Sequence, residues 1–143
     1  MTLHLVKLCV GVSTIDELVE YIESDLADQR RRGLDPEDTH TTRMFPQRAG
    51  ELLDGGSLYW VIRGNIQARQ RLLAIRPVTG RDGIQRCQLV FEPRVVATEW
   101  QPRRAFQGWR YLPAEDAPRD LSESGKRLLP AQLRSELADL GLL

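Results

Sequence analysis

Arginine and aromatic side chains alternate through the middle of the chain, and this pattern has the clearest chemical potential. Arginine supplies forked N–H donors for phosphate oxygens and stacks on rings, while exposed aromatic rings stack on nucleic-acid bases. In a strand, residues two apart share a face, so Trp109 and Tyr111 are expected on one side. The candidate binding residues are Arg43, Arg48, Tyr59, Trp60, Arg63, Arg69, Arg71, Arg103, Trp109 and Arg110.

A purely structural interpretation fits the same residues. Alternating arginines are typical of the water-facing side of any sheet, and each tryptophan taken singly is expected in the core. The run Arg30–Arg32 is expected to complement the carbonyl end of a helix rather than to form a binding patch. Both interpretations therefore stay open for the arginine set.

Residues that could support catalysis or metal binding are sparse. The two histidines, His4 and His40, stand at no metal-ligand spacing, and His4 is expected to be a packed or edge residue. Cys9 and Cys87 form no CxxC pair, so we expect two free thiols, no metal site and no cofactor. No nucleophile-elbow or Walker-type loop is present.

The charges are unevenly distributed although the net charge is zero. Residues 1–42 hold nine acidic and four basic side chains, which gives a balance of −5. Residues 43–112 hold twelve arginines and five acids, a balance of +7, and residues 113–143 hold six acids and four bases, a balance of −2. A local positive field can exist at zero net charge, so the central segment is the expected contact for an anionic partner.

Periodicity predicts a strand and a helix in the first third of the chain. Residues 2–10 have the composition of a strand. Thr14 and Glu17 have the spacing of a helix-capping box, an apolar stripe runs from Ile15 to Leu26, and Gly33 is a natural terminator. Residues 34–42 are expected to form an exposed loop, and a short helix is expected from Pro46 to the Gly55-Gly56 pair.

Strand signals then dominate, separated by tight turns. Strands are predicted over residues 58–62, 66–75, 84–91, 95–100 and 106–112, followed by a connection over 113–129 and a helix from Pro130. Consecutive strands without intervening helices favour an antiparallel sheet or small barrel, and the class is α+β. We expect one domain over residues 1–143, with strand, helix and helix in 1–56, β-structure in 57–112, and connection and helix in 113–143.

No apolar run approaches the ~20 residues that span a bilayer, and no secretory signal is recognisable at the start. The protein is therefore expected in the cytoplasm, without a membrane partner.

Four segments together resemble a known family: Lys7–Gly11, Thr42–Arg48, Leu52–Gly64 and Phe106–Leu112. They resemble the DUF1489 family, a group of short uncharacterised proteins found mainly in alphaproteobacteria. The resemblance covers nearly the whole chain. It implies a single-domain protein of the bacterial cytosol, and it transfers no activity and no catalytic residue.

The segment Trp60–Gly64 is also similar to an element of the PUA-like barrels, which include the ASCH and EVE domains. This similarity implies a small, mainly antiparallel PUA-like β-barrel or curved sheet with flanking helices. The Gly, Lys, Glu and Arg signature of some catalytic ASCH domains is absent, which puts catalysis in doubt and leaves binding open.

We expect a module that binds RNA or a modified nucleotide, and whether it also catalyses a reaction stays open. Phosphate contacts are assigned to Arg63, Arg69, Arg71 and Arg110, and base stacking to Trp60 or Trp109.

The alternative is a small hydrolase or transferase acting on a nucleotide-like substrate. Its candidate residues are Arg43, Arg48, Glu51, Asp54 and Tyr59, and it requires a buried carboxylate with a raised pKa beside an arginine. A third possibility, a scaffold that binds only protein, requires a contiguous exposed apolar surface.

Overall fold

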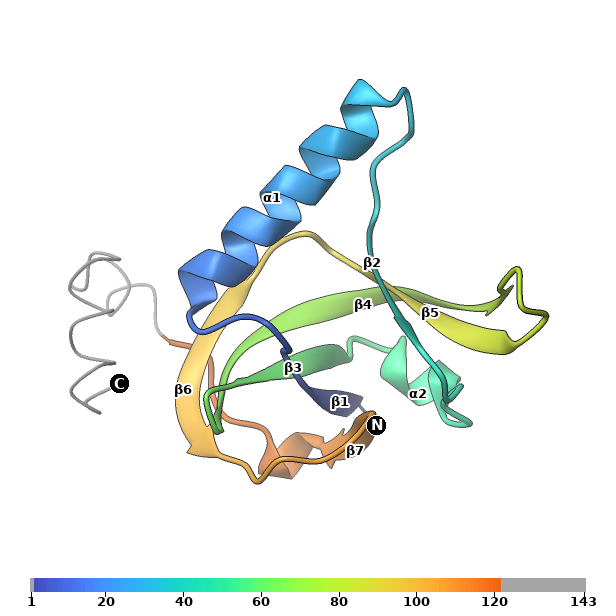
Figure 1. Ribbon diagram of the computed structural model, residues 1–143. Coiled ribbons are helices and arrows are strands. Elements are labelled where there is room, and N and C mark those ends of the chain that lie inside the picture. Colours follow the sequence, from blue (N-terminus) through green and yellow to red (C-terminus); the bar gives the residue numbers. More distant parts are fainter. Residues whose placement is uncertain (1, 122–143) are drawn as a thin grey trace.

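The computed structural model describes residues 2–121 and shows a mixed seven-stranded sheet with two α-helices (Figure 1). The elements are β1 (Leu3–Leu8), α1 (Ile15–Arg31), β2 (Asp38–Thr42), α2 (Ala49–Leu52), β3 (Ser57–Ile62), β4 (Asn65–Thr79), β5 (Gln85–Phe91), β6 (Val96–Pro102), β7 (Trp109–Pro113) and the short 3₁₀ helix η1 (Ala114–Asp116). The α+β class is confirmed. The predicted helix from Pro130 lies outside the described residues.

The strand order is β2-β5-β4-β3-β1-β7, and β6 also pairs with β4. All pairs are antiparallel except β1 with β3, whose parallel register places Leu5 opposite Leu58. β4 is long enough to serve two partners on one edge, because its first half pairs with β6 and its second half with β5. A mainly antiparallel sheet is thus confirmed.

Closure into a barrel, one of the two forms expected, is wrong. Among residues 2–121 no strand ladder joins β6 to β7, and the sheet stays open there. Instead, the irregular chain after β7 crosses back to β6, where Glu99 N donates to Arg119 O (2.8 Å) and Leu121 N donates to Ala97 O (3.0 Å). We call residues 114–121 the crossing segment. It covers the face of the sheet on which His4 and Tyr59 lie, and it does not close the sheet into a barrel.

Helix α1 forms for the reasons that the sequence indicates. The Thr14 side chain accepts a hydrogen bond from Glu17 N (3.1 Å), and the Glu17 carboxylate accepts from Ser13 N (3.2 Å). Leu18, Ile22 and Leu26 form the buried stripe of the helix. They belong to the larger core cluster, together with residues of β1, β3, β4, β5 and β7.

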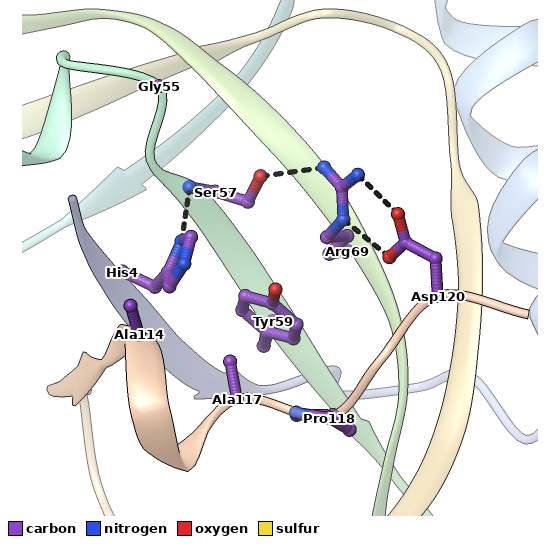
Figure 2. Close-up of a pocket in the computed structure, with 9 residues that line it drawn as sticks. All are labelled: His4, Gly55, Ser57, Tyr59, Arg69, Ala114, Ala117, Pro118 and Asp120. Carbon is purple, nitrogen blue, oxygen red and sulfur yellow. Dashed lines mark hydrogen bonds and ion pairs between the residues drawn. The ribbon is translucent and has the colours of Figure 1, made fainter.

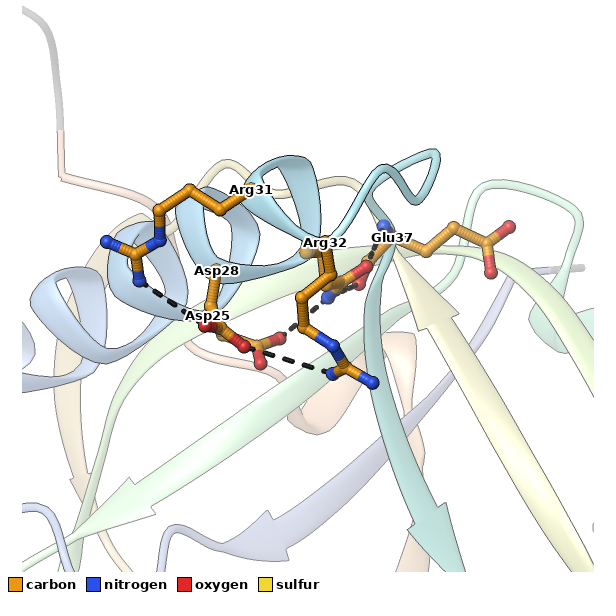
Figure 3. A network of polar contacts seen from close by, with 6 residues as sticks. Asp25, Asp28, Arg31, Arg32 and Glu37 are labelled. Carbon is orange, nitrogen blue, oxygen red and sulfur yellow. Dashed lines mark hydrogen bonds and ion pairs between the residues drawn. The ribbon is translucent and has the colours of Figure 1, made fainter.

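The C-terminal turn of α1 is tied down by its own acids (Figure 3). Arg31 and Arg32 both lie beside Asp28, at 3.3 and 3.9 Å. Gln29 donates to the Glu37 carbonyl and accepts from the Glu37 amide, both at 2.9 Å, and so connects the helix end to the approach of β2. The interpretation of this arginine run as a helix-end feature is supported by these contacts.

Strand β2 corrects the expected loop over residues 34–42. Residues 38–42 pair in register with β5, from Asp38 opposite Phe91 to Thr42 opposite Cys87. The segment Asp-Thr-His-Thr-Thr has no apolar alternation, so the strand forms because a long partner supplies its hydrogen bonds. The helix expected from Pro46 is also shorter than predicted, since α2 spans only Ala49–Leu52.

A glycine fixes the passage from α2 into the sheet. A Cβ atom at Gly56 would collide with the carbonyl oxygens of Leu52 and Leu3, so only glycine allows α2 to lie this close to β1.

Within residues 2–121, no helix is long and apolar enough to cross a membrane.

Candidate functional site

Two places on the molecule gather the chemically capable residues. The first is a pocket of about 310 Å³ on the face of the sheet that the crossing segment covers (Figure 2). Strands β1, β3 and β4 contribute its floor, and the chain after β7 contributes its wall. The lining residues are His4, Gly55, Ser57, Tyr59, Arg69, Ala114, Ala117, Pro118 and Asp120.

The arginine of the pocket is held in a fixed orientation. Arg69 Nε and NH2 donate to the Asp120 carboxylate at 2.8 and 2.7 Å, and NH1 donates to Ser57 Oγ at 3.0 Å. This hydrogen-bonded pairing raises the pKa of Arg69, so the guanidinium stays charged while its charge is balanced locally. The pair also fastens the crossing segment to β4.

The histidine of the pocket is held as an uncharged ring. His4 Nδ1 accepts a hydrogen bond from Ser57 N at 3.0 Å, across the parallel pair of β1 and β3. Burial lowers the pKa of His4, and the nearby Arg69 charge lowers it further. The ring packs edge-on against Tyr59, with centroids 5.0 Å apart.

These contacts do not form a nucleophile with its base. Ser57 Oγ accepts from Arg69, and His4 is bonded to the main chain of Ser57 rather than to its hydroxyl. The geometry fits the binding of a polar molecule.

The second place is the edge strand β7, where side chains hold a basic loop. Trp109 Nε1 donates to Met44 O at 2.8 Å, and the Tyr111 hydroxyl accepts from Arg48 N at 3.1 Å. The loop of residues 43–48 therefore lies against β7. It exposes Arg43 and also Phe45, whose residue exposure is 44 %.

On the other side of β7 two guanidinium groups meet one ring. The Arg103 and Arg110 Cζ atoms lie 5.7 and 5.3 Å from the centroid of the Phe106 ring. Arg110 NH1 also donates to Gln107 O (2.7 Å) and Trp109 O (3.0 Å), which fixes its position. Arg103 N donates to Gly64 O (2.9 Å), so the turn that carries Arg63 adjoins this cluster.

Four arginines around β7 lack an acidic partner among the described residues. Within residues 2–121, no ion pair joins Arg43, Arg63, Arg103 or Arg110 to a carboxylate. Arg48 differs, because it forms a salt bridge to Glu51 at 2.5 Å while its guanidinium lies 5.6 Å from the Tyr111 ring.

The two tryptophans proposed for base stacking are both in the core. Trp60 is 5 % exposed and donates to Gln70 Oε1 (2.9 Å), and Gln70 in turn donates to Asp38 (2.6 Å). Trp109 is 7 % exposed and anchors the basic loop. This is the core placement that the sequence favoured for each tryptophan taken singly.

The structure therefore divides the ten predicted residues among four environments. Arg43, Arg48, Arg63, Arg103, Trp109 and Arg110 gather around β7, Tyr59 and Arg69 line the pocket, and Trp60 lies in the core. Arg71 is exposed on β4, opposite Ser57 in register.

The hydrolase alternative requires a carboxylate with a raised pKa, and the pKa of Glu51 is not raised. Its hydrogen bonds to Arg48 lower the pKa of Glu51. No group of three or more metal-ligating side chains occurs within the described residues.

Sequence reasoning missed several residues that the structure brings into these sites. His4, Ser57 and Asp120 meet only through the pairing of β1, β3 and β4 and the crossing segment, which no local pattern signals. Phe45 and Phe106 carried a usable signal, since each stands close to arginine in the chain, but the tryptophans were preferred as stacking rings.

Searches of curated proteins and of solved structures returned no match, and nothing in these comparisons supports a PUA-like assignment. A family described as a protein of unknown function, DUF1489, matches residues 5–143. The match extends from β1 through every later element described above. The chain therefore belongs to the DUF1489 family.

Proposed function

We propose that the protein binds single-stranded RNA along the edge strand β7. The observation that carries the proposal is the anchoring of the basic loop: Trp109 and Tyr111 of β7 bond to its backbone at 2.8 and 3.1 Å. This anchoring places Arg43 and Phe45 beside a strand whose other side carries Arg103 and Arg110.

Phosphate recognition is assigned to Arg43, Arg103 and Arg110. None of them is paired with a carboxylate within residues 2–121, so a phosphate need not displace an internal partner. Arg110 is already oriented by two carbonyl oxygens, which reduces the entropy lost when it contacts a ligand. Residues 55–81 and 100–114 contain no acidic side chain, so the surrounding chain adds little repulsion.

Base stacking is assigned to the exposed ring of Phe45 and to the cluster around Phe106. Stacking on an aromatic ring contributes ~1–3 kcal/mol per base and tolerates any sequence. Guanidinium planes also stack on bases, so Arg103 and Arg110 can extend the surface that Phe106 begins. Recognition of this type depends on unpaired bases, which is why a single strand is proposed.

The test compares two double variants that remove the same charge. Arg43→Ala with Arg110→Ala removes one arginine on each side of β7. Arg81→Ala with Arg94→Ala removes two exposed arginines outside the strands, in the segments that flank β5. Binding of a fluorescein-labelled RNA of about twelve nucleotides is followed by fluorescence anisotropy at low salt.

The β7 double variant is expected to bind roughly ten-fold or more weakly, and the control to stay within about two-fold of wild type. Equal losses in both would show that only net charge matters, and an absence of binding in wild type would remove the proposal. A single-stranded DNA of the same sequence, bound equally well, would show that the ribose is not recognised and would overturn the choice of RNA.

A further inference from the structure

Side chains that line the pocket on the covered face carry hydrogen-bond donors, among them those of His4, Tyr59 and Arg69. Tyr59 is 4 % exposed, and its hydroxyl makes no hydrogen bond to another group within residues 2–121. The Tyr59 hydroxyl is not among the buried polar atoms that lack a partner. It is therefore accessible to solvent, through the pocket that Tyr59 lines. A polar group on an otherwise buried ring is therefore available to a ligand.

His4 supplies a second donor. Because Nδ1 accepts from Ser57 N, the neutral ring carries its proton on Nε2. Protonation of Nδ1 would set its new N–H against the N–H of Ser57, and two donors repel each other. The hydrogen bond from Ser57 N therefore also keeps the ring neutral. No hydrogen bond of Nε2 to the described part of the chain is present, which leaves this N–H for a ligand.

Arg69 supplies further donors but little net charge. Three of the five guanidinium N–H groups are used, two by Asp120 and one by Ser57. The others can reach a ligand, but the paired carboxylate balances the positive charge. Among the described residues that line the pocket, Arg69 is the one permanent cation, and it is paired with Asp120. An entering anion would therefore meet the Asp120 carboxylate with no second described cation to offset it.

We propose that this pocket binds a small neutral molecule that presents carbonyl oxygens, with the size of one nucleobase. Donors from Tyr59, His4 and Arg69 match carbonyl acceptors, and the balanced charge selects a neutral ligand over an anion. A volume of about 310 Å³ lies at the small end of ligand pockets, which span ~300–1,000 Å³. This site stands independently of RNA binding at β7.

The probe is uracil, a neutral ring with two carbonyl groups, titrated against the full chain and followed by NMR. Saturable shifts are expected at the Ser57 amide, the His4 ring nitrogens and the Ala117 amide. Acetate and inorganic phosphate are titrated in parallel and are expected to cause much smaller shifts at the same positions. Shifts from acetate or phosphate but not uracil, or uracil shifts confined to other residues, would overturn the proposal.

Tyr59→Phe removes one donor and keeps the ring. Uracil affinity is expected to fall by roughly three- to ten-fold, while the melting temperature stays near wild type because the hydroxyl makes no hydrogen bond within residues 2–121. Tyr21→Phe is the matched control, since Tyr21 is 68 % exposed on α1 and should bind uracil like wild type. Wild-type affinity in Tyr59→Phe would contradict the assignment of its hydroxyl.

The β7 double variant Arg43→Ala with Arg110→Ala separates the two proposals. It is expected to bind uracil with wild-type affinity even where RNA binding is lost. Loss of uracil binding in this variant would place the uracil site at β7 and would contradict a separate pocket.

Discussion

The C-terminal turn of α1 and the edge strand β7 are both rich in arginine, but their guanidinium groups have different neighbours. At the end of α1, Arg31 and Arg32 share Asp28, within a network that also holds β2 (Figure 3). At β7, Arg103 and Arg110 lie against the Phe106 ring, and within residues 2–121 neither has a carboxylate partner. The sequence pattern is similar, but Arg31 and Arg32 are paired with an acid, whereas Arg103 and Arg110 lie against an aromatic ring.

The two regions also differ in what anchors them. The end of α1 is held by exposed ion pairs and an amide side chain, which are individually weak. The basic loop at β7 is held by Trp109 and Tyr111, whose rings also pack edge-on with centroids 4.9 Å apart. Because Trp109 is buried, we expect it to restrict the motion of the basic loop, and a restricted loop loses less entropy on binding.

The largest expected effect of a single substitution is at Trp109. Trp109→Ala leaves a cavity in the larger core cluster and removes the hydrogen bond to Met44 O, so the free energy of unfolding should fall by roughly 3–5 kcal/mol. Urea denaturation followed by far-UV circular dichroism measures it. A loss below about 1 kcal/mol would mean that Trp109 is no structural anchor, and the difference between the two regions would disappear.

A smaller, pH-dependent effect is expected at His40 in β2, the strand joined to the end of α1. Burial, together with the charge of Lys7, lowers the pKa of His40 from 6.5 to about 4, and its buried Nε2 has no hydrogen-bond partner in the described part of the chain. The unfolded chain therefore takes up the proton at higher pH than the folded one. Stability from this group is complete above about pH 6.5 and is lost as the pH falls toward 4.

His40→Asn removes this titration. The melting temperature of wild type should drop more between pH 7 and pH 5 than that of the variant, measured by differential scanning fluorimetry in matched buffers. His4 titrates in both proteins and cancels in the comparison. Parallel pH profiles would show that His40 is not buried as described.

The smallest effect is expected at the end of α1. Arg31→Ala with Arg32→Ala removes two exposed ion pairs, each typically contributing ~0.2–1 kcal/mol, and should leave RNA affinity within about two-fold of wild type. Urea denaturation and anisotropy check the two outcomes. Weakened RNA binding equal to that of the β7 double variant would mean that both arginine regions contact the strand.

Local signals in the sequence predicted the elements that depend on neighbours in the chain. The Thr14–Glu17 capping box and the Leu18–Ile22–Leu26 stripe predicted α1, and the Gly80–Gly83 turn predicted the hairpin of β4 and β5. Strand β2 was missed because its polar residues are ordered by pairing with β5, about fifty residues away. The barrel alternative was wrong, because closure depends on whether β6 and β7 meet, which turn signals do not determine.

In the candidate sites, too, residues marked by local sequence were predicted, and those brought together by long-range pairing were not. The arginines that gather at β7 are predicted from the sequence, but the rings of Phe45 and Phe106 are not. Which rings are buried depends on which residues of the sheet face α1. Trp60 and Trp109 face that core, whereas Phe106 packs on the smaller cluster beneath the crossing segment. The pocket at His4 requires the parallel pairing of β1 and β3, which brings together residues 53 positions apart.

The salt dependence of RNA affinity tests the central claim most directly. Three phosphate contacts, at Arg43, Arg103 and Arg110, predict a slope of log Kobs against log salt of about −2 for wild type, since each contact on a single strand contributes ~−0.7. Removing Arg43 and Arg110 should reduce the slope to about −0.7. An unchanged slope in the double variant, or a slope near zero in wild type, would contradict RNA binding at β7.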